Sequence, residues 1–290
     1  MNDKADKLVI FLAKRDGIDK LVKTFQYVSK LVHWHTEAGH PEVAQRFKQW
    51  EVASGLSRKA FRTGRFLTGF NALRRGPGST PTFRSLAVLA NAGEMVYFFF
   101  DHLLWLSRIG TLDAKLAKRM SFISAFGESF GYVFFIIADV IVMRQGLQAE
   151  RRQLANISSQ EGQEDDEDAK ESIRKIRADR IMRLMAVAAN VADLIIALAE
   201  IQPNPFCNHA LTLGISGLVS AWAGWIFNME EMEKKESYKG MKSPDNGTFE
   251  ISSGRMPLTP ISSFIHDLSS KSPKEQYLEV GGHELTPPRQ

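Results

Sequence analysis

Four apolar segments between residues 86 and 229 constrain the fold most. Residues 201–229, a run of 29, contain no Lys, Arg, Asp or Glu. About 20 apolar residues in a helix suffice to cross a bilayer, so this run is the strongest candidate for a transmembrane helix. Three further apolar segments precede it, at 86–106, 120–143 and 181–201. We therefore expect an all-α integral membrane bundle, although the mean hydropathy of the chain is only −0.19.

The three earlier segments carry acidic residues at helical spacing. Glu94 and Asp101 share a face of the first segment, and Asp193 and Glu200 share an arc of the third. The polar stripe of the second segment consists of Ser121, Ser124, Glu128, Tyr132 and Asp139. An acid that faces lipid at mid-bilayer costs about 2.5 kcal/mol or more, so these faces must meet other helices, water or headgroups.

Two architectures satisfy that requirement. The segments either form a packed bundle in which some helices cross the membrane, or lie shallowly within one leaflet. Five of these acids suggest an alternative function, a pore or solute transporter whose pathway they line: Glu94, Asp101, Glu128, Asp139 and Asp193. A soluble helical adaptor is a third possibility.

The last apolar segment carries small residues every four positions. This small-xxx-small pattern lets membrane helices approach closely, and it predicts a helix-packing face. The face consists of Ser216, Gly217, Ser220, Ala221 and Gly224.

The first half of the chain is basic, and residues 52–93 contain no Asp or Glu. On a helical wheel of residues 56–73, Arg58, Arg62 and Arg65 lie opposite an apolar face, and Lys59 falls within the apolar arc, from which its stem can reach the headgroups. The apolar face consists of Leu56, Ala60, Thr63, Phe66, Leu67, Phe70 and Leu73. This pattern predicts a helix that binds an anionic lipid membrane and forms on contact with it, because Gly64 and Gly69 weaken it in water by about 1 kcal/mol each.

The remaining regions complete the predicted organisation. Residues 1–50 form an amphipathic helical region whose apolar stripe, which includes Phe25 and Val28, is expected to face the protein core, with a break at Gly39-His40-Pro41. Residues 51–81 hold the basic helix and its closing turn, and 82–147 and 181–229 hold the membrane helices. A charged linker is expected at 148–180 and a disordered tail at 230–290.

Other classes of protein lack support in the sequence. A single cysteine, Cys207, permits no internal disulfide, and no secretory signal is visible. His33, His35 and His40 lack the spacing of a metal site, so neither metal nor cofactor is expected. No phosphate-binding loop or nucleophile motif points to an enzyme. Apolar, membrane-like segments directly follow the basic stretch, which favours lipid over nucleic acid as its partner.

With these segments placed, the sequence resembles the peroxin-11 family of peroxisomal membrane proteins, especially its plant members. The resemblance covers about residues 5–227. It is carried by residues 20–27 (KLVKTFQY), 56–62 (LSRKAFR), 98–106 (FFFDHLLWL) and 214–225. The chain departs from the family in the 63 residues that follow Phe227.

The resemblance implies an integral protein of the peroxisomal membrane, multi-pass, with both termini in the cytosol. Family members insert an amphipathic helix into the cytosolic leaflet, curve and elongate the membrane, and promote peroxisome proliferation. They form homo-oligomers and hetero-oligomers with other members, and they help recruit a fission adaptor and a dynamin-related GTPase. By position, the inserted helix corresponds to residues 56–73.

Overall fold

The computed structural model describes residues 14–74, 80–159 and 166–241, which are all-helical with short connections and contain no strand. Thr80, the N-cap of α5, accepts a hydrogen bond from the Phe83 amide, and Pro41 and Pro81 occupy the first turns of α3 and α5, where no amide proton is needed. The helices are α2 (Arg15–Thr36), α3 (Pro41–Phe61), α4 (Phe66–Arg74), α5 (Pro81–Arg108), the short η1 (Ala114–Leu116), α6 (Ala117–Ser159), α7 (Asp166–Ile201) and α8 (Ala210–Met241).

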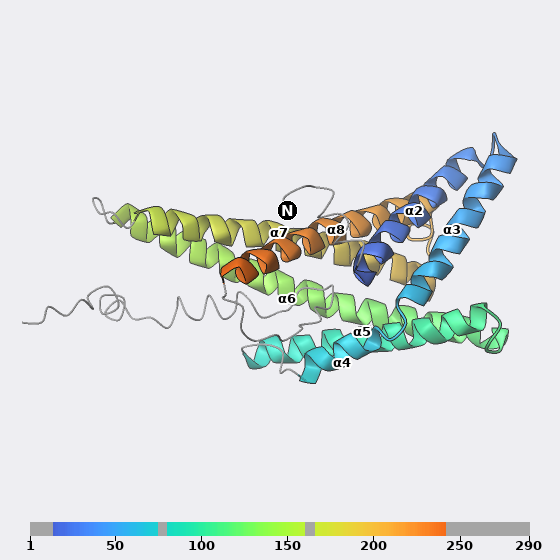
Figure 1. Cartoon of the computed structure of the whole chain (residues 1–290), viewed down its shortest axis with the longest axis horizontal. Coiled ribbons are helices and arrows are strands. Elements are labelled where there is room, and N and C mark those ends of the chain that lie inside the picture. The colour runs from blue at the N-terminus through green and yellow to red at the C-terminus, as the bar shows by residue number, and fades with distance from the viewer. Residues whose placement is uncertain (1–13, 75–79, 160–165, 242–290) are drawn as a thin grey trace, which may run out of the picture.

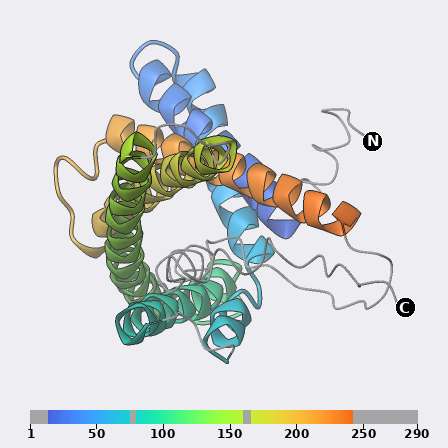
Figure 2. The same cartoon turned by 90° about the vertical axis from the view of Figure 1, so that its left-hand side faces the viewer.

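Six of these helices form a closed ring. Each packs on two neighbours, in the order α2, α8, α7, α6, α5 and α3, and α3 in turn contacts α2. Figure 2, which looks along the long axis, shows this arrangement end-on. The short helix α4 lies outside the ring, against α5 (Figure 1). The connections at 37–40 and 109–116 lie at the same end of the molecule, on the right of Figure 1.

Helices α5 and α6 cross at three glycines. A Cβ atom built at Gly93 would lie 2.6 Å from the Gly131 backbone nitrogen and 2.7 Å from the Gly127 carbonyl oxygen. One built at Gly127 would lie 2.9 Å from the Tyr97 nitrogen. Because backbone meets backbone here, no side chain can move away to make room for a methyl group.

The small-residue face of α8 packs within the same chain. Gly217 lies under the Tyr27 ring of α2, so that a Cβ atom there would overlap the ring. Ser216, Ser220 and Ala221 are buried, and Gly224 is in close contact with the Lys20 side chain. In this structure the face that the sequence predicts for helix packing is covered by α2.

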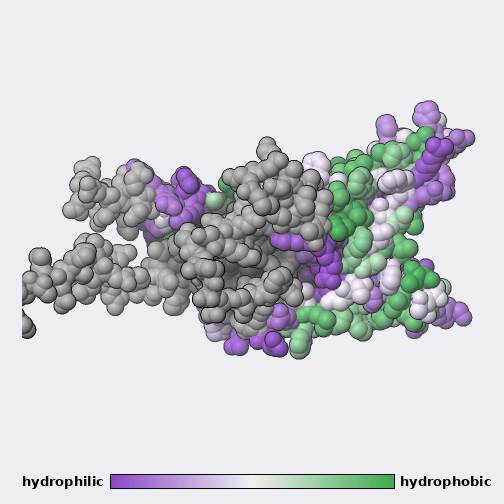
Figure 3. Space-filling model, viewed as in Figure 1, coloured by the Kyte–Doolittle hydropathy of each residue, from purple (hydrophilic) through white to green (hydrophobic). Residues whose placement is uncertain are grey.

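Many large apolar side chains are exposed on the outside of the ring. Hydrophobic side chains gather over the right-hand half of the face in Figure 3, bounded by hydrophilic residues at the right edge. Two described stretches, Ala114–Ala155 across η1 and α6 and Lys170–Ile201 in α7, are long and apolar enough to cross a bilayer. Their exposed side chains include Phe126, Leu184 and Val191.

Several predicted boundaries differ from the structure. The charge-free run 201–229 is not one helix, because residues 202–209 form a connection and the apolar part of α8, Ala210–Ile226, is shorter than a full span. Most of the predicted linker 148–180 is helical, since α6 extends to Ser159 and α7 begins at Asp166. α8 also continues through the first residues of the predicted tail to Met241, and residues 242–290 lie outside the described part of the chain.

Candidate functional site

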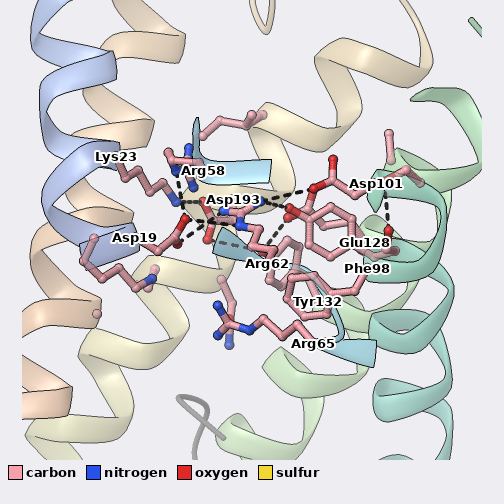
Figure 4. A pocket seen from close by; sticks show the side chains of 18 of the residues that line it. Asp19, Lys23, Arg58, Arg62, Arg65, Phe98, Asp101, Glu128, Tyr132 and Asp193 are labelled. Carbon is pink, nitrogen blue, oxygen red and sulfur yellow. Dashed lines mark hydrogen bonds and ion pairs between the residues drawn. The ribbon is translucent and has the colours of Figure 1, made fainter. Parts of the chain in front are cut away.

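The ring encloses a charged cavity of about 210 Å³ (Figure 4). All six ring helices contribute to its wall, and 13 of the 28 lining residues are charged. The acids are Asp19, Asp101, Glu128, Asp139, Asp193 and Glu200, and the bases are Lys20, Lys23, Arg58, Lys59, Arg62, Arg65 and Arg108. Charges of both signs therefore face one another across the middle of the ring.

Asp19 of α2 holds two arginines of α3. Asp19 is only 3% exposed, and its carboxylate accepts hydrogen bonds from Arg58 Nε and Arg62 Nε, each with a donor–acceptor distance of 3.2 Å. Burial alone would raise the pKa of Asp19, but Arg62 and Arg58 outweigh it and lower the pKa far below its ordinary value. Arg58 also donates to Gln26 Oε1 at a distance of 2.7 Å. The buried ion pair between α2 and α3 thus has hydrogen-bond partners for both the carboxylate and the guanidinium.

Cationic side chains also close the seam between α3 and α5. Lys59 pairs with Asp101, and Arg62 donates to the Tyr97 hydroxyl oxygen. Arg65, in the turn after α3, lies over the Phe98 ring, with its guanidinium carbon 4.8 Å from the ring centre. It also forms an ion pair with Asp16 at a distance of 3.0 Å. This seam is thus polar, in contrast to the glycine-lined crossing of α5 and α6.

The opposite wall is joined through Asp193 of α7. Lys23 of α2 donates to Asp193 Oδ1 at a distance of 2.5 Å, and Ser220 of α8 donates to Asp193 Oδ2 at 2.6 Å. The Tyr132 hydroxyl of α6 lies 2.7 Å from Glu128 Oε1 and 3.2 Å from Asp193 Oδ2, so its one proton serves either carboxylate. One carboxylate therefore connects α2, α6, α7 and α8.

A further buried ion pair joins α6 and α7. Arg183 is 2% exposed and donates hydrogen bonds to Asp139 Oδ1 at 2.9 Å and to Asp179 Oδ2 at 3.1 Å. Helix packing is thus sufficient to explain why Asp101, Asp139 and Asp193 occur in apolar segments, because each has a basic partner on a neighbouring helix.

The predicted membrane helix at 56–73 is two helices, and this is a correction. α3 ends at Phe61, residues 62–65 form a turn in which Gly64 has a φ of +73°, and α4 begins at Phe66. The turn rotates the two halves relative to each other, which separates the charges from the apolar side chains.

The members of that predicted site therefore lie in different places. Arg58, Arg62 and Arg65 point into the ring, and the ion pairs described above hold them there. Leu67 and Phe70 of α4 are each 56% exposed on the outside, whereas Phe66 packs edge-on against Phe99 of α5. Leu56, Lys59 and Leu73 are half-buried. The binding of lipid by these residues stays a prediction.

The amphipathic helix α2 is oriented opposite to the expectation. Its buried residues are Gly17, Asp19, Lys23, Tyr27 and Ser29. The apolar stripe that was expected to face the core lies outside, with Phe25 49% exposed and Val28 40%. The expectation was wrong because it applied the rule for a helix on an apolar core. Here Asp19 and Lys23 face charged partners inside the ring, so the polar face of α2 turns inward.

The sequence reasoning missed Asp19, Lys20 and Lys23 as site residues. The available signal was their spacing, since Asp19, Lys23 and Tyr27 recur every four residues and so share one face of a helix. The histidines show no sign of a shared ligand: among the described residues no three His, Cys, Asp or Glu side chains are grouped as a metal site would require.

Charged groups inside, apolar side chains outside and two helices of spanning length define an integral membrane helical bundle. Residues 5–229 match the family model for peroxisomal biogenesis factor 11 (PEX11). The chain belongs to this family. It is thus a peroxisomal membrane protein of peroxisome biogenesis.

Several curated relatives support this assignment. Peroxisomal membrane protein 11B of Arabidopsis thaliana is 70% identical over 226 residues, which are 78% of this chain and 97% of the relative. Peroxisomal membrane protein 11-4 of Oryza sativa subsp. indica is 68% identical over the same shares. A more distant relative, the peroxisomal membrane protein 11 homolog of Dictyostelium discoideum, is 26% identical over 77% of this chain and 93% of its own length. No solved structure matches the chain.

Proposed function

We propose that this protein curves and elongates the peroxisomal membrane by inserting the exposed face of α4 into the cytosolic leaflet. The observation that carries the proposal is the pair Leu67 and Phe70, which lie three residues apart and project from the outside of the ring. Arg74, also exposed, follows one turn later and adds attraction to anionic headgroups of about 1 kcal/mol. A helix inserted into one leaflet expands that leaflet, and curvature follows from the difference in area.

The topology and assembly expected for the family belong to the same proposal. Multi-pass insertion is supported by the lengths of α6 and α7, and cytosolic placement of both termini by the family resemblance. Self-association, association with other family members, and recruitment of a fission adaptor and a dynamin-related GTPase are proposed on the resemblance alone. Since α2 covers the small residues of α8, a second copy would meet the other side of α8, where Val219 and Trp222 are exposed.

We expect the double substitution Leu67→Gln with Phe70→Gln to reduce membrane tubulation strongly. Together the two side chains contribute about 2 kcal/mol of transfer free energy, which corresponds to a loss of about thirtyfold in insertion of α4. The measurement is electron microscopy of vesicles that contain anionic lipid and the reconstituted full chain.

The matched control is Val43→Gln, which removes an exposed apolar side chain at the far end of α3. It should leave tubulation unchanged. Equal tubulation by the double variant and the wild type, at equal reconstituted amounts, would refute α4 as the inserted element.

The charged cavity favours a second candidate function, a pathway for small solutes across the membrane. Of the acids that the sequence suggested for such a pathway, Asp101, Glu128, Asp139 and Asp193 line the cavity, and Glu94 does not. Because several of them also hold the ring together, a test by neutralising them would confuse conduction with unfolding.

A bulky substitution on the cavity wall gives a cleaner test. Ala189→Trp fills part of the 210 Å³ cavity and should abolish any conductance of the reconstituted protein, whereas Val191→Trp, exposed on another face of the same helix, should preserve it. Planar-bilayer recording checks both variants. Absence of conductance in the wild type, or unaltered conductance in Ala189→Trp, would rule out this pathway.

A further inference from the structure

Among the described residues, two cations that line the cavity, Lys20 and Arg108, make no hydrogen bond or ion pair through their side chains. Lys20 of α2 lines the cavity, and within the described residues its ammonium makes neither a hydrogen bond nor an ion pair. The neighbouring basic groups are already engaged, Lys23 with Asp193, Arg58 and Arg62 with Asp19, and Arg65 with Asp16. Arg108 is exposed, so Lys20 remains as the half-buried cation whose hydrogen-bond donors are unused among the described residues and are available to a ligand.

The surroundings of Lys20 favour an anion over a neutral ligand. Its ammonium lies against the backbone of α8, where a Cβ atom at Gly224 would come within 2.7 Å of Nζ. The charged groups that act on it are Asp19 and Lys23 of α2, Arg65 from the turn before α4, and Asp193 of α7. Burial, together with Lys23, lowers the pKa of Lys20 to about 7, and bound negative charge would offset both effects.

The size of the cavity limits the ligand. A volume of 210 Å³ corresponds to about seven water molecules in the liquid and is below the roughly 300–1,000 Å³ of pockets for drug-sized molecules. A phosphate or carboxylate group with a few further atoms fits, whereas a nucleotide does not. Asp101 Oδ2, buried and without a hydrogen-bond partner among the described residues, offers an acceptor for a donor group on the same ligand or on a water molecule.

The geometry points to the cavity as a binding site for a small water-soluble anion that carries a phosphate or carboxylate group, with Lys20 as its principal contact. This site is independent of membrane curvature and of solute passage, since binding requires neither. It lies inside the ring, away from the exposed face of α4.

The test uses the full chain in nanodiscs of phosphatidylcholine and the thermal unfolding midpoint as a function of inorganic phosphate, with chloride at equal ionic strength as reference. Phosphate should raise the midpoint of the wild type, because a ligand that binds only the folded state stabilises it. Lys20→Gln should lose this increase and bind phosphate at least about tenfold more weakly, since a charge-assisted contact is removed. Lys30→Gln, on the same helix but outside the cavity, should behave as the wild type.

A second variant guards against a folding effect of the first. In Gly224→Ala, the new methyl group occupies the place of the Lys20 ammonium, a flexible group that can move aside, so the fold should persist while phosphate binding weakens. Sulfate binding, measured as a function of pH, is a third test, because the charge of sulfate is constant above pH 5. Its binding should weaken as the pH rises from 6 to 8, because Lys20 loses its proton across that range.

The proposal fails if phosphate stabilises the wild type and Lys20→Gln equally, since a general salt effect would then explain the increase. It also fails if the only anion that stabilises the wild type through Lys20 is an anionic lipid added to the nanodisc, because the ligand would then be a headgroup. Tubulation by the same variants should equal that of the wild type whichever result is found.

Discussion

Replacing Asp19 by Asn should destabilise the protein by about 3 kcal/mol or more. The amide keeps the shape of the side chain but removes the negative charge that holds Arg58 and Arg62, and a buried cation left without its partner is strongly unfavourable. The thermal unfolding midpoint in detergent, followed by circular dichroism, should fall by roughly 10 °C. Glu42→Gln, the same change at an exposed position in the first turn of α3, should shift it by little.

The pH dependence of this difference has a defined sign. The folded state lowers the pKa of Asp19, so its contribution is complete above the unfolded pKa of about 4 and is lost as the pH falls toward the folded value. The difference in midpoint between wild type and Asp19→Asn should therefore be constant from pH 8 to 5 and decrease below about pH 4. A difference that grows on acidification would contradict the assignment of Asp19 as the buried anion.

Replacing Gly93 by Ala should also destabilise the protein, by about 1–3 kcal/mol, although alanine favours helices by about 1 kcal/mol over glycine. The methyl group would meet the backbone of Gly127 and Gly131 in α6, so the helices must separate. Gly146→Ala is the matched control, because the nearest atom to its new Cβ would be Ile176 Cγ2 at 3.8 Å.

The two glycine variants should change stability in opposite directions, Gly93→Ala downward and Gly146→Ala slightly upward, when their unfolding midpoints are compared under one set of conditions. A stabilised Gly93→Ala would show that α5 and α6 do not cross as closely as the structure has them. Disulfide cross-linking between cysteines placed on α5 and α6 provides an independent measure of that distance.

The all-helical fold and the polar faces of its helices could be predicted from the sequence. The stripe in α6 that contains Ser124, Glu128, Tyr132 and Asp139 lines the cavity as one face, because residues three and four apart in a helix share a side regardless of what that side meets. Spacing thus predicted which residues lie together on each helix, and the cost of placing acids in lipid predicted that these faces meet other groups.

The partners and the direction of each face were not accessible. Lys23 and Asp193 are 170 residues apart, and nothing in helical spacing specifies that α2 lies beside α7 and α8. The charged face of α2 turns inward because its partners lie on α3 and α7, and the sequence of α2 does not specify those partners. The break at Gly64 was missed because the wheel of 56–73 assumed an uninterrupted helix, whereas a glycine with positive φ ends one.

The order of the helices around the ring also bears on how the protein is made. Helices α5, α6 and α7 each pack on the next helix in the chain, but α2 packs on α8, which is synthesised after all the other described helices. The pair α2 and α3 is therefore synthesised before the other ring helices and can take its place in the ring last. Until it does, Asp193 lacks its lysine and the small residues of α8 lack their cover, so a nascent chain presents polar groups that a chaperone or a second chain can reach.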